Sequence, residues 1–347
     1  MRASRELLKL GQFNGIFGYD DLEDNMRAAP TRRLCTGMAL AFLLVSLVSL
    51  HVSGFAAGAP PVSRTPDGHP DLQGIWNNST QTPLQRPVAL GNRQFYTDEE
   101  LARLQPHDHD SDALATGDPG TYNQFWWEEG GFLKQTSLIV DPPNGRIPPL
   151  TPDGERRRAE FRARGDNRSD NPEERNLAER CITRSVPKLP GGYNNNFQIV
   201  QTPGYIMIMQ EMIHEARIIP LDGRPHAASA ITSYLGDSRG RWEGDTLVVE
   251  TTNFRRNVDE TSYTCCGGAS DHLSIVERFT LVDNDAIDYR YTVNDPTMFT
   301  RPWTVSVPMR RVDGPIYEYA CHEGNVGMEG ILRGGRAEER RATHITK

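Results

Sequence analysis

The clearest hydrophobic pattern in the chain is a two-residue alternation over residues 205–219. A period of two predicts a β-strand whose apolar set faces a core. One alternate set is mostly apolar and consists of Ile206, Ile208, Gln210, Met212, His214, Ala216 and Ile218. Gln210 and His214 then lie among aliphatic neighbours, where an unpaired polar group costs roughly 1–3 kcal/mol. These two residues mark the predicted strand as a candidate functional site.

Further strands are predicted along the second half of the chain, with one more near residues 71–77. They cover residues 197–201, 246–254, 273–282, 286–293, 304–311 and 316–321. Turn-like sequences connect them without long helical crossovers, which implies an antiparallel sheet that closes or splits. The sequence therefore predicts a mainly β protein: an antiparallel, up-and-down, lipocalin-like β-barrel with a few short peripheral helices. A β-sandwich is the alternative.

The predicted elements divide the chain into four regions. Residues 1–57 form an N-terminal extension and signal peptide, and residues 58–192 form an irregular, short-helical segment that wraps the barrel. Residues 193–322 form the barrel core, and residues 323–347 form a glycine-rich tail and a terminal helix. The first strand carries Gly74 and Trp76, a spacing typical of the closed end of a small barrel.

The N-terminal region has the pattern of a secretory signal peptide. Arg32 and Arg33 precede a short apolar run at residues 38–50, and small residues follow it up to Ala59. The run is short for a membrane anchor, which is the alternative. Because a long stretch precedes the arginine pair, Met26 is a candidate start. We expect an exported protein, periplasmic or secreted, with no stable membrane span after cleavage.

Charge and cysteine content limit the classes of binding partner and bear on the redox compartment of the protein. The formal net charge of −8 at pH 7 argues against nucleic acid or anionic membranes as partners. Cys181, Cys265, Cys266 and Cys321 follow the signal peptide. In an exported protein we expect a disulfide between Cys181 and Cys321. A bridge between the adjacent Cys265 and Cys266 would be strained, so free or intermolecular thiols are the alternative there.

Three residues form the predicted acid–base set: His214, Glu277 and His322. Glu277 interrupts the apolar set of its strand, and His322 follows the last predicted strand. An imidazole and a carboxylate in a dry interior can act as a general base near neutral pH. In the structural alternative, Glu277 forms a buried salt bridge with Arg217 or Arg290, and His214 is a satisfied core histidine. The predicted substrate-binding residues are Gln210, Arg217, Asn195, Trp126 and Tyr193.

No metal and no other cofactor are predicted. His214, His226 and His322 lack the short spacing typical of a metal site, so ligands would have to come from separate strands. A phosphate-binding glycine loop and a GxSxG nucleophile elbow are absent from the sequence. Trp126 belongs to an aromatic cluster that either walls a pocket or seals a core.

Several long strings resemble those of a large family of uncharacterised exported bacterial proteins. They cover nearly all of residues 64–340 and include PDLQGIWN, YNNNFQIVQTPGY, HEARIIPLDGRPH, GRWEGDTLVVETTNF and YEYACHEGN. The resemblance implies secretion and brings no established reaction, so it assigns no catalytic residue. Cys181 and Cys321 lie in or beside such strings, and the segment with Cys265 and Cys266 does not.

The leading hypothesis is an exported barrel enzyme that acts on a small, partly hydrophobic molecule bound inside the barrel. General acid–base chemistry would make it an isomerase, a lyase or a hydrolase. The alternative is a non-catalytic, lipocalin-like binding protein for a lipid, a pigment or an aromatic compound, which needs anchoring groups and no proton transfer. A structural envelope protein with a filled barrel is the third possibility.

Overall fold

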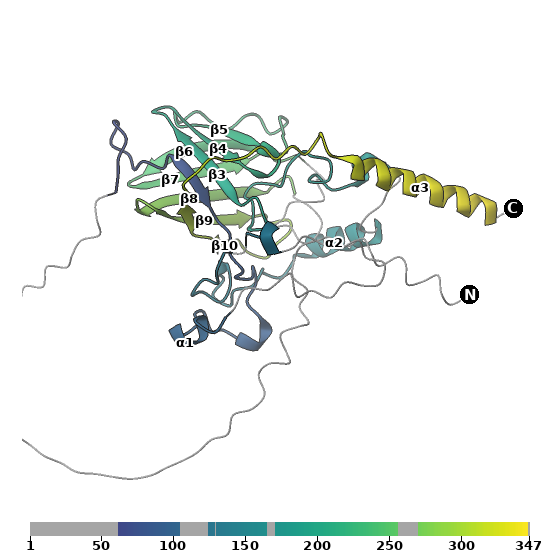
Figure 1. Ribbon diagram of the computed structural model, residues 1–347, viewed down its shortest axis with the longest axis horizontal. Helices are drawn as coiled ribbons and strands as arrows, with labels where there is room; N and C mark the ends of the chain where they lie inside the picture. The colour runs from purple at the N-terminus through teal and green to yellow at the C-terminus, as the bar shows by residue number, and fades with distance from the viewer. Residues whose placement is uncertain (1–61, 105–123, 129, 165–170, 256–269, 346–347) are drawn as a thin grey trace, which may run out of the picture. The chain divides into compact units, whose positions relative to one another are not determined.

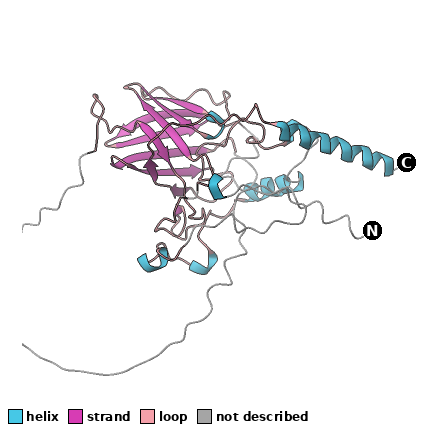
Figure 2. Cartoon of the chain, viewed as in Figure 1, coloured by secondary structure: helices cyan, strands magenta, loops and turns pink. Residues whose placement is uncertain are grey.

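The computed structural model describes residues 62–104, 124–128, 130–164, 171–255 and 270–345. The predicted signal peptide, the candidate start at Met26, and Cys265 with Cys266 lie outside the described residues. Within them the protein is mainly antiparallel β, as the strands in Figures 1 and 2 show.

The strands form a nearly closed, barrel-like sheet in the order β5, β4, β3, β1, β11, β9, β8, β7 and β6. A tenth strand, β10, pairs with β9 and with the short β2. The edge strands β5 and β6 lie side by side, because a Cβ atom added to Gly240 of β6 would lie 3.0 Å from Ile219 of β5. The predicted antiparallel barrel is confirmed. The bounds are β1 Gly74–Asn77, β2 Ile139–Asp141, β3 Asn196–Gln201, β4 Tyr205–Gln210, β5 Ala216–Pro220, β6 Asp237–Glu243, β7 Thr246–Thr252, β8 Ser274–Asp283, β9 Ala286–Asn294, β10 Trp303–Ser306 and β11 Met309–Arg311.

Helices are few and lie outside the sheet. Thr97 and Glu100 form a capping box at the start of α1. The Asn325 side chain accepts a hydrogen bond from the Met328 amide at the start of α3 (3.4 Å), and α3 covers most of the predicted glycine-rich tail. The bounds are α1 Asp98–Leu101, α2 Pro152–Arg164 and α3 Val326–Ile345, with 3₁₀ turns η1 Val88–Leu90, η3 Gln124–Trp126, η4 Pro172–Glu174 and η5 Met212–His214.

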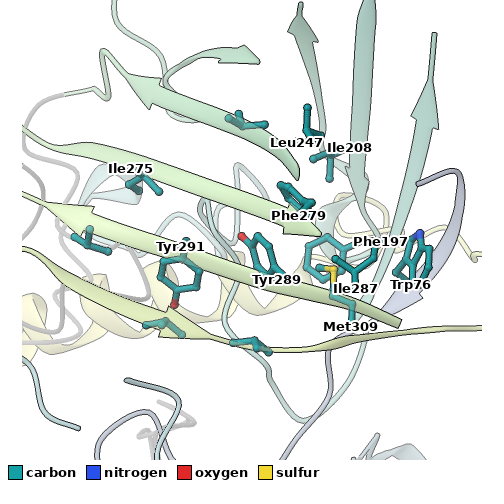
Figure 3. Close-up of a cluster of buried hydrophobic side chains, with 14 of the residues drawn as sticks. Trp76, Phe197, Ile208, Leu247, Ile275, Phe279, Ile287, Tyr289, Tyr291 and Met309 are labelled. Carbon is teal, nitrogen blue, oxygen red and sulfur yellow. The ribbon is translucent and has the colours of Figure 1, made fainter. Parts of the chain in front are cut away.

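The barrel core follows the two-residue alternation of its strands. On β8 and β9 every second side chain points inward and is buried, whereas Arg278 and Arg290 between them are exposed. Phe279 stacks on Tyr289 with ring centroids 4.6 Å apart, and Figure 3 shows both rings among aliphatic side chains. The inward set is Ile275, Glu277, Phe279, Leu281, Ile287, Tyr289, Tyr291 and Val293.

The prediction of one strand over residues 205–219 is wrong. The chain reverses through η5, where Ile213 and His214 have φ angles of 64° and 44°, so that β4 and β5 pair with each other. Arg217 and Ile219 therefore point into the barrel, and His214, Ala216 and Ile218 are exposed. The predicted core position of His214 is likewise wrong, because the reversal inverts the alternation.

The predicted strand at residues 316–321 is also absent from the structure, where this segment is irregular. The preceding strand, β11, already pairs with β1 on one side and β9 on the other. A strand after β11 would have no free edge beside it.

Gly74 and Trp76 of β1 pack against Arg311 of the neighbouring strand β11. The Arg311 guanidinium lies over the buried Trp76 ring, 4.3 Å from its centroid, and donates a hydrogen bond to the Gln73 carbonyl (2.8 Å). Gly74 has a φ of 135°, and a Cβ atom there would collide with the Arg311 guanidinium. Glycine is therefore required for the stacking.

Replacing Gly74 with alanine is expected to reduce the free energy of unfolding by about 2 kcal/mol, since both the φ angle and the stacking are affected. Urea denaturation measures this loss. Gly68→Ala is the matched control, because Gly68 has a φ of 87° with no atom within 4 Å of the added Cβ. Equal losses in the two variants would contradict a role for the contact with Arg311.

Candidate functional site

The barrel interior contains a small cavity near the segment that precedes β3. Its volume is about 10 Å³, which is room for about one water molecule. Figure 3 shows part of its wall, with Phe197, Ile208 and Met309 near the rings of Phe279 and Tyr289. The lining residues are Pro187, Lys188, Phe197, Ile208, Gln210, Arg217, Glu277, Phe279, Tyr289 and Met309.

A buried ion pair between Arg217 and Glu277 crosses the interior from β5 to β8. The Arg217 guanidinium donates two hydrogen bonds to the carboxylate, at 2.6 and 3.0 Å, and the Tyr289 hydroxyl donates a third at 2.8 Å. Burial disfavours the charge of Arg217, but the Glu277 carboxylate outweighs burial and raises the pKa of Arg217. Burial and the Glu277 charge raise the pKa of Tyr289 well above its ordinary value. The salt bridge with Arg217, one of the structural alternatives for Glu277, is confirmed.

Two polar atoms of the cavity residues have no hydrogen-bond partner among the described residues. They are Oε1 of Gln210 and Nε of Arg217. The amide nitrogen of Gln210 is satisfied, because it donates to the Ser185 carbonyl (3.0 Å). Buried polar atoms are normally paired, so the cavity offers one acceptor and one donor to a small polar group.

Lys188 is a buried lysine beside this ion pair. Its side chain is buried, and its ammonium group donates to Oδ1 of Asn195 (2.9 Å) and lies 6.0 Å from the centroid of the Phe197 ring. Burial and the charge of Arg184 lower the pKa of Lys188 to about 7, against the charges of Glu128, Glu211 and Glu215. At neutral pH the amine is therefore divided between its charged and neutral forms.

Glu215 is a second group with a strongly shifted pKa, and it does not line the cavity. Burial raises its pKa to about 7, opposed by the Thr183 hydroxyl, the charge of Arg217, the Arg184 amide and the charge of Lys188. Both carboxylate oxygens are buried and neither has a partner in full hydrogen-bonding geometry among the described residues. The Thr183 hydroxyl and the Arg184 amide thus lower the pKa of Glu215 somewhat, but neither forms a well-aligned hydrogen bond with its carboxylate oxygens.

A network of asparagines holds Lys188 in place. Oδ1 of Asn195 also accepts from the Gly191 amide (2.8 Å), and its Nδ2 donates to Glu128 (3.2 Å). The Glu128 carboxylate in turn accepts from the Asn194 and Asn195 amides (2.9 and 3.0 Å). Asn195 is fully buried and does not line the cavity. It therefore holds the amine from behind the cavity wall.

The backbone near Lys188 and Glu215 adopts conformations that non-glycine residues rarely take. Six non-glycine residues in the described part of the chain have positive φ, and all except Asn253 lie close in sequence to one of these two groups. Such conformations persist where the surrounding structure imposes them, and they concentrate at functional sites. The five are Cys181, Ser185, Asn194, Ile213 and His214.

The predicted disulfide between Cys181 and Cys321 is confirmed. It joins the segment before Lys188 to the segment after β11. The Asn325 side chain reinforces this connection by donating to the Glu179 carbonyl (2.8 Å). Nδ1 of His214 donates to the Tyr319 carbonyl (3.0 Å), so the residues after β11 also contact the turn that carries Glu215.

The structure does not bring the predicted acid–base set together. Only Glu277 lines the cavity, and it is held by Arg217 and Tyr289. His214 and His322 are exposed and do not line the cavity. The reversal at η5 displaces His214, and the absence of the last predicted strand leaves His322 in an irregular segment.

The predicted substrate-binding residues fall into three groups. Gln210 and Arg217 line the cavity, and Asn195 lies behind Lys188. Trp126 is exposed and Tyr193 is partly exposed, and neither lines the cavity.

Sequence reasoning missed Lys188 and Glu215. Lys188 lies in an irregular, proline-containing segment without periodicity, and Glu215 lies in a turn region that the alternation predicts as part of one continuous strand. One signal could have identified Lys188: the chain has 38 Lys and Arg residues, of which only Lys9, Lys134, Lys188 and Lys347 are lysines.

Among the described residues, no group of three or more His, Cys, Asp or Glu side chains could hold a metal ion. None of the helices in the described ranges is long and apolar enough to cross a membrane. We compared the chain with family models, with curated proteins and with solved structures, and none of them matches it; the resemblance to exported bacterial proteins stays a prediction.

Proposed function

We propose that the protein is an exported enzyme that performs acid–base chemistry on a small, partly hydrophobic molecule at the Lys188 end of the barrel. The observation that carries this proposal is that Lys188, which lines the cavity, and Glu215, whose charge influences it, have pKa values shifted in opposite directions. Burial brings the pKa of the amine down to about 7 and that of the carboxyl group up to about 7. Such opposed shifts are how enzymes obtain an acid and a base at neutral pH.

Each group has a distinct role in the proposed reaction. The neutral Lys188 amine accepts a proton from the substrate, and the protonated Glu215 carboxyl group donates one. Asn195 positions the amine, and the Arg217–Glu277 pair gives a fixed polar surface to the cavity that Phe197 and Phe279 also line. Because the cavity holds about one water molecule, only a small polar part of the substrate enters it.

Export is part of the proposal. It is supported by the apolar run behind Arg32 and Arg33 and by the disulfide, which is typical of proteins in oxidising compartments.

Non-catalytic binding of a small molecule is the second candidate. The unpartnered Gln210 and Arg217 atoms favour it, because they offer recognition without proton transfer. In this case the cavity would recognise one polar group of the ligand, and Lys188 would act only as a hydrogen-bond donor.

Proton transfer can be tested without knowing the natural substrate. We expect the mature protein to accelerate deuterium incorporation next to the carbonyl of small ketones in D₂O at pH 7, or the hydrolysis of small activated esters. Lys188→Met should reduce the rate by about 100-fold or more, and Glu215→Gln by a similar factor. Nuclear magnetic resonance measures the exchange, and absorbance measures the hydrolysis.

The matched control is Lys134→Met, since Lys134 is an exposed lysine paired with Asp98. It should retain the full rate. The rate of the wild-type protein should also depend on pH around 7, which a merely structural lysine would not produce. Equal rates for wild type and Lys188→Met across the panel would exclude Lys188 as the proton acceptor.

A further inference from the structure

We propose that the Lys188 amine is also a nucleophile, which condenses with the carbonyl group of an aldehyde or ketone to form an imine. This inference rests on the proposed function and names its substrate class and its first covalent bond. It follows from the place of Lys188 in the cavity lining, from its hydrogen bonding and from the unpartnered atoms of Gln210 and Arg217, which line the same cavity.

The choice of lysine at this position is the first support. Arginine supplies nearly all positive charge in the chain, including the interior cation Arg217, and lysine is confined to Lys9, Lys134, Lys188 and Lys347. A guanidinium group stays protonated in proteins, whereas an amine can lose its proton and react. A buried amine beside a buried guanidinium thus provides a property that the arginine lacks.

The environment of the amine is the second support. Lys188 is 4% exposed and lines the cavity, and its ammonium group donates a hydrogen bond of 2.9 Å to Asn195. Within the described part of the chain it forms no ion pair. A carboxylate in contact would hold the amine in its charged form, so this arrangement leaves a neutral amine able to attack.

The unpartnered atoms account for the oxygen of the carbonyl group. The amine attacks the carbonyl carbon, a nitrogen–carbon bond forms, and the carbonyl electron pair moves to the oxygen, which takes up the proton that the nitrogen releases. The unpartnered N–H of Arg217 is a donor for this oxygen, and the unpartnered Oε1 of Gln210 is an acceptor for the resulting hydroxyl.

The second half of the reaction releases one water molecule. The hydroxyl takes up a proton, which the Glu215 carboxyl group supplies in this proposal, and leaves as water while the nitrogen electron pair forms the carbon–nitrogen double bond. Amine, carbonyl compound and this proton thus give a protonated imine and water and leave Glu215 as a carboxylate, without an oxidant or a reductant. The cavity of about 10 Å³ has room for this one water. The protonated imine then acidifies the neighbouring C–H bond, which connects this step to the proposed proton transfer.

Reductive trapping in the wild-type protein tests the proposal. The mature protein is incubated at pH 7 with propanal or hydroxyacetone and cyanoborohydride, digested, and analysed by mass spectrometry. We expect Lys188 to be alkylated at least about tenfold faster than Lys134, although the Lys134 side chain is 57% exposed. At pH 7 about half of the Lys188 amines are neutral, against about one in 2,500 for an ordinary lysine.

Two variants separate this reaction from nonspecific labelling. Gln210→Leu keeps the amine and should slow the labelling of Lys188 while leaving that of Lys134 unchanged. Lys134→Arg removes the reference site and should leave the labelling of Lys188 intact. Labelling of Lys134 without labelling of Lys188 would overturn the proposal.

The outcomes also distinguish this proposal from the proposed function. Deuterium exchange that depends on Lys188 without any trapped adduct would leave proton transfer standing and remove the imine. Trapping at Lys188 without exchange or hydrolysis would support the carbonyl site and contradict acid–base turnover.

Discussion

Replacing Glu277 with glutamine is expected to reduce the free energy of unfolding by about 3–5 kcal/mol, because it leaves the Arg217 charge buried without a counter-ion. Glu277 is fully buried and Arg217 is 7% exposed. Glutamine has nearly the volume of glutamate, so the loss reports the charge and not a cavity. Urea denaturation followed by circular dichroism measures the change.

A surface pair on the same sheet provides the matched control. Glu243 accepts hydrogen bonds from Arg241 and Arg278, with distances of 2.7 and 2.9 Å, but these side chains are 39–54% exposed. Glu243→Gln should therefore change the free energy of unfolding far less than Glu277→Gln. A loss for Glu277→Gln no larger than that for Glu243→Gln would mean that the interior pair does not carry a desolvated charge.

A double variant distinguishes the cost of one unpaired buried charge from the effect of removing the whole ion pair. Arg217→Met with Glu277→Leu removes both charges and should recover much of the lost stability. Such a recovery would show that the interior pair does not stabilise the fold on balance. Its presence would then be better explained by the polar surface that it gives to the cavity beside Lys188.

The fold could be predicted where the evidence for each element was local. The alternation of β8 and β9 placed Glu277 on the inner face, and the turn residues between strands indicated an antiparallel meander. The position of β1 between β3 and β11 was not visible, because pairing between strands so distant in the chain leaves no local pattern.

The reversal between β4 and β5 was missed because its residues carry no turn signal. The turn runs through Glu-Met-Ile-His-Glu, without the glycine, proline or asparagine that usually permits a positive φ. The contacts of the folded chain impose this conformation on Ile213 and His214 instead. Since neighbouring strand residues point to opposite faces, the missed turn moved His214 from the predicted inner face to the outer face.

The candidate site was missed for a related reason. The pKa values of Lys188 and Glu215 depend on burial by segments far apart in the sequence. Gln210 and Glu277 were found because each breaks an apolar alternation, whereas Lys188 lies in a segment with no alternation to break.

The two buried groups should also give the stability of the protein an unusual dependence on pH. The pKa of Glu215 is raised from 4.5 to about 7, so the folded state holds a proton that the unfolded state has released between these values. Its contribution to the free energy of unfolding therefore falls as the pH rises from 4.5 to 7. The pKa of Lys188 is lowered from 10.5 to about 7, so above pH 7 the unfolded state holds the additional proton. Its contribution rises as the pH increases from 7 to 10.5.

Together these contributions give the free energy of unfolding a minimum near pH 7. The free energy should rise by about 3–5 kcal/mol from this minimum towards pH 4.5 and towards pH 10.5. The expected result is best seen as a difference between wild type and variants in urea denaturation at a series of pH values. Lys188→Met should remove the rise above pH 7, and Glu215→Gln should remove the fall below it, whereas Lys134→Met should keep both. If Lys188→Met instead kept the wild-type profile from pH 7 to 10, the lysine would be charged in the folded protein. Such an amine could serve neither as the proton acceptor nor as the nucleophile, so this measurement tests the common requirement of both proposals without any substrate.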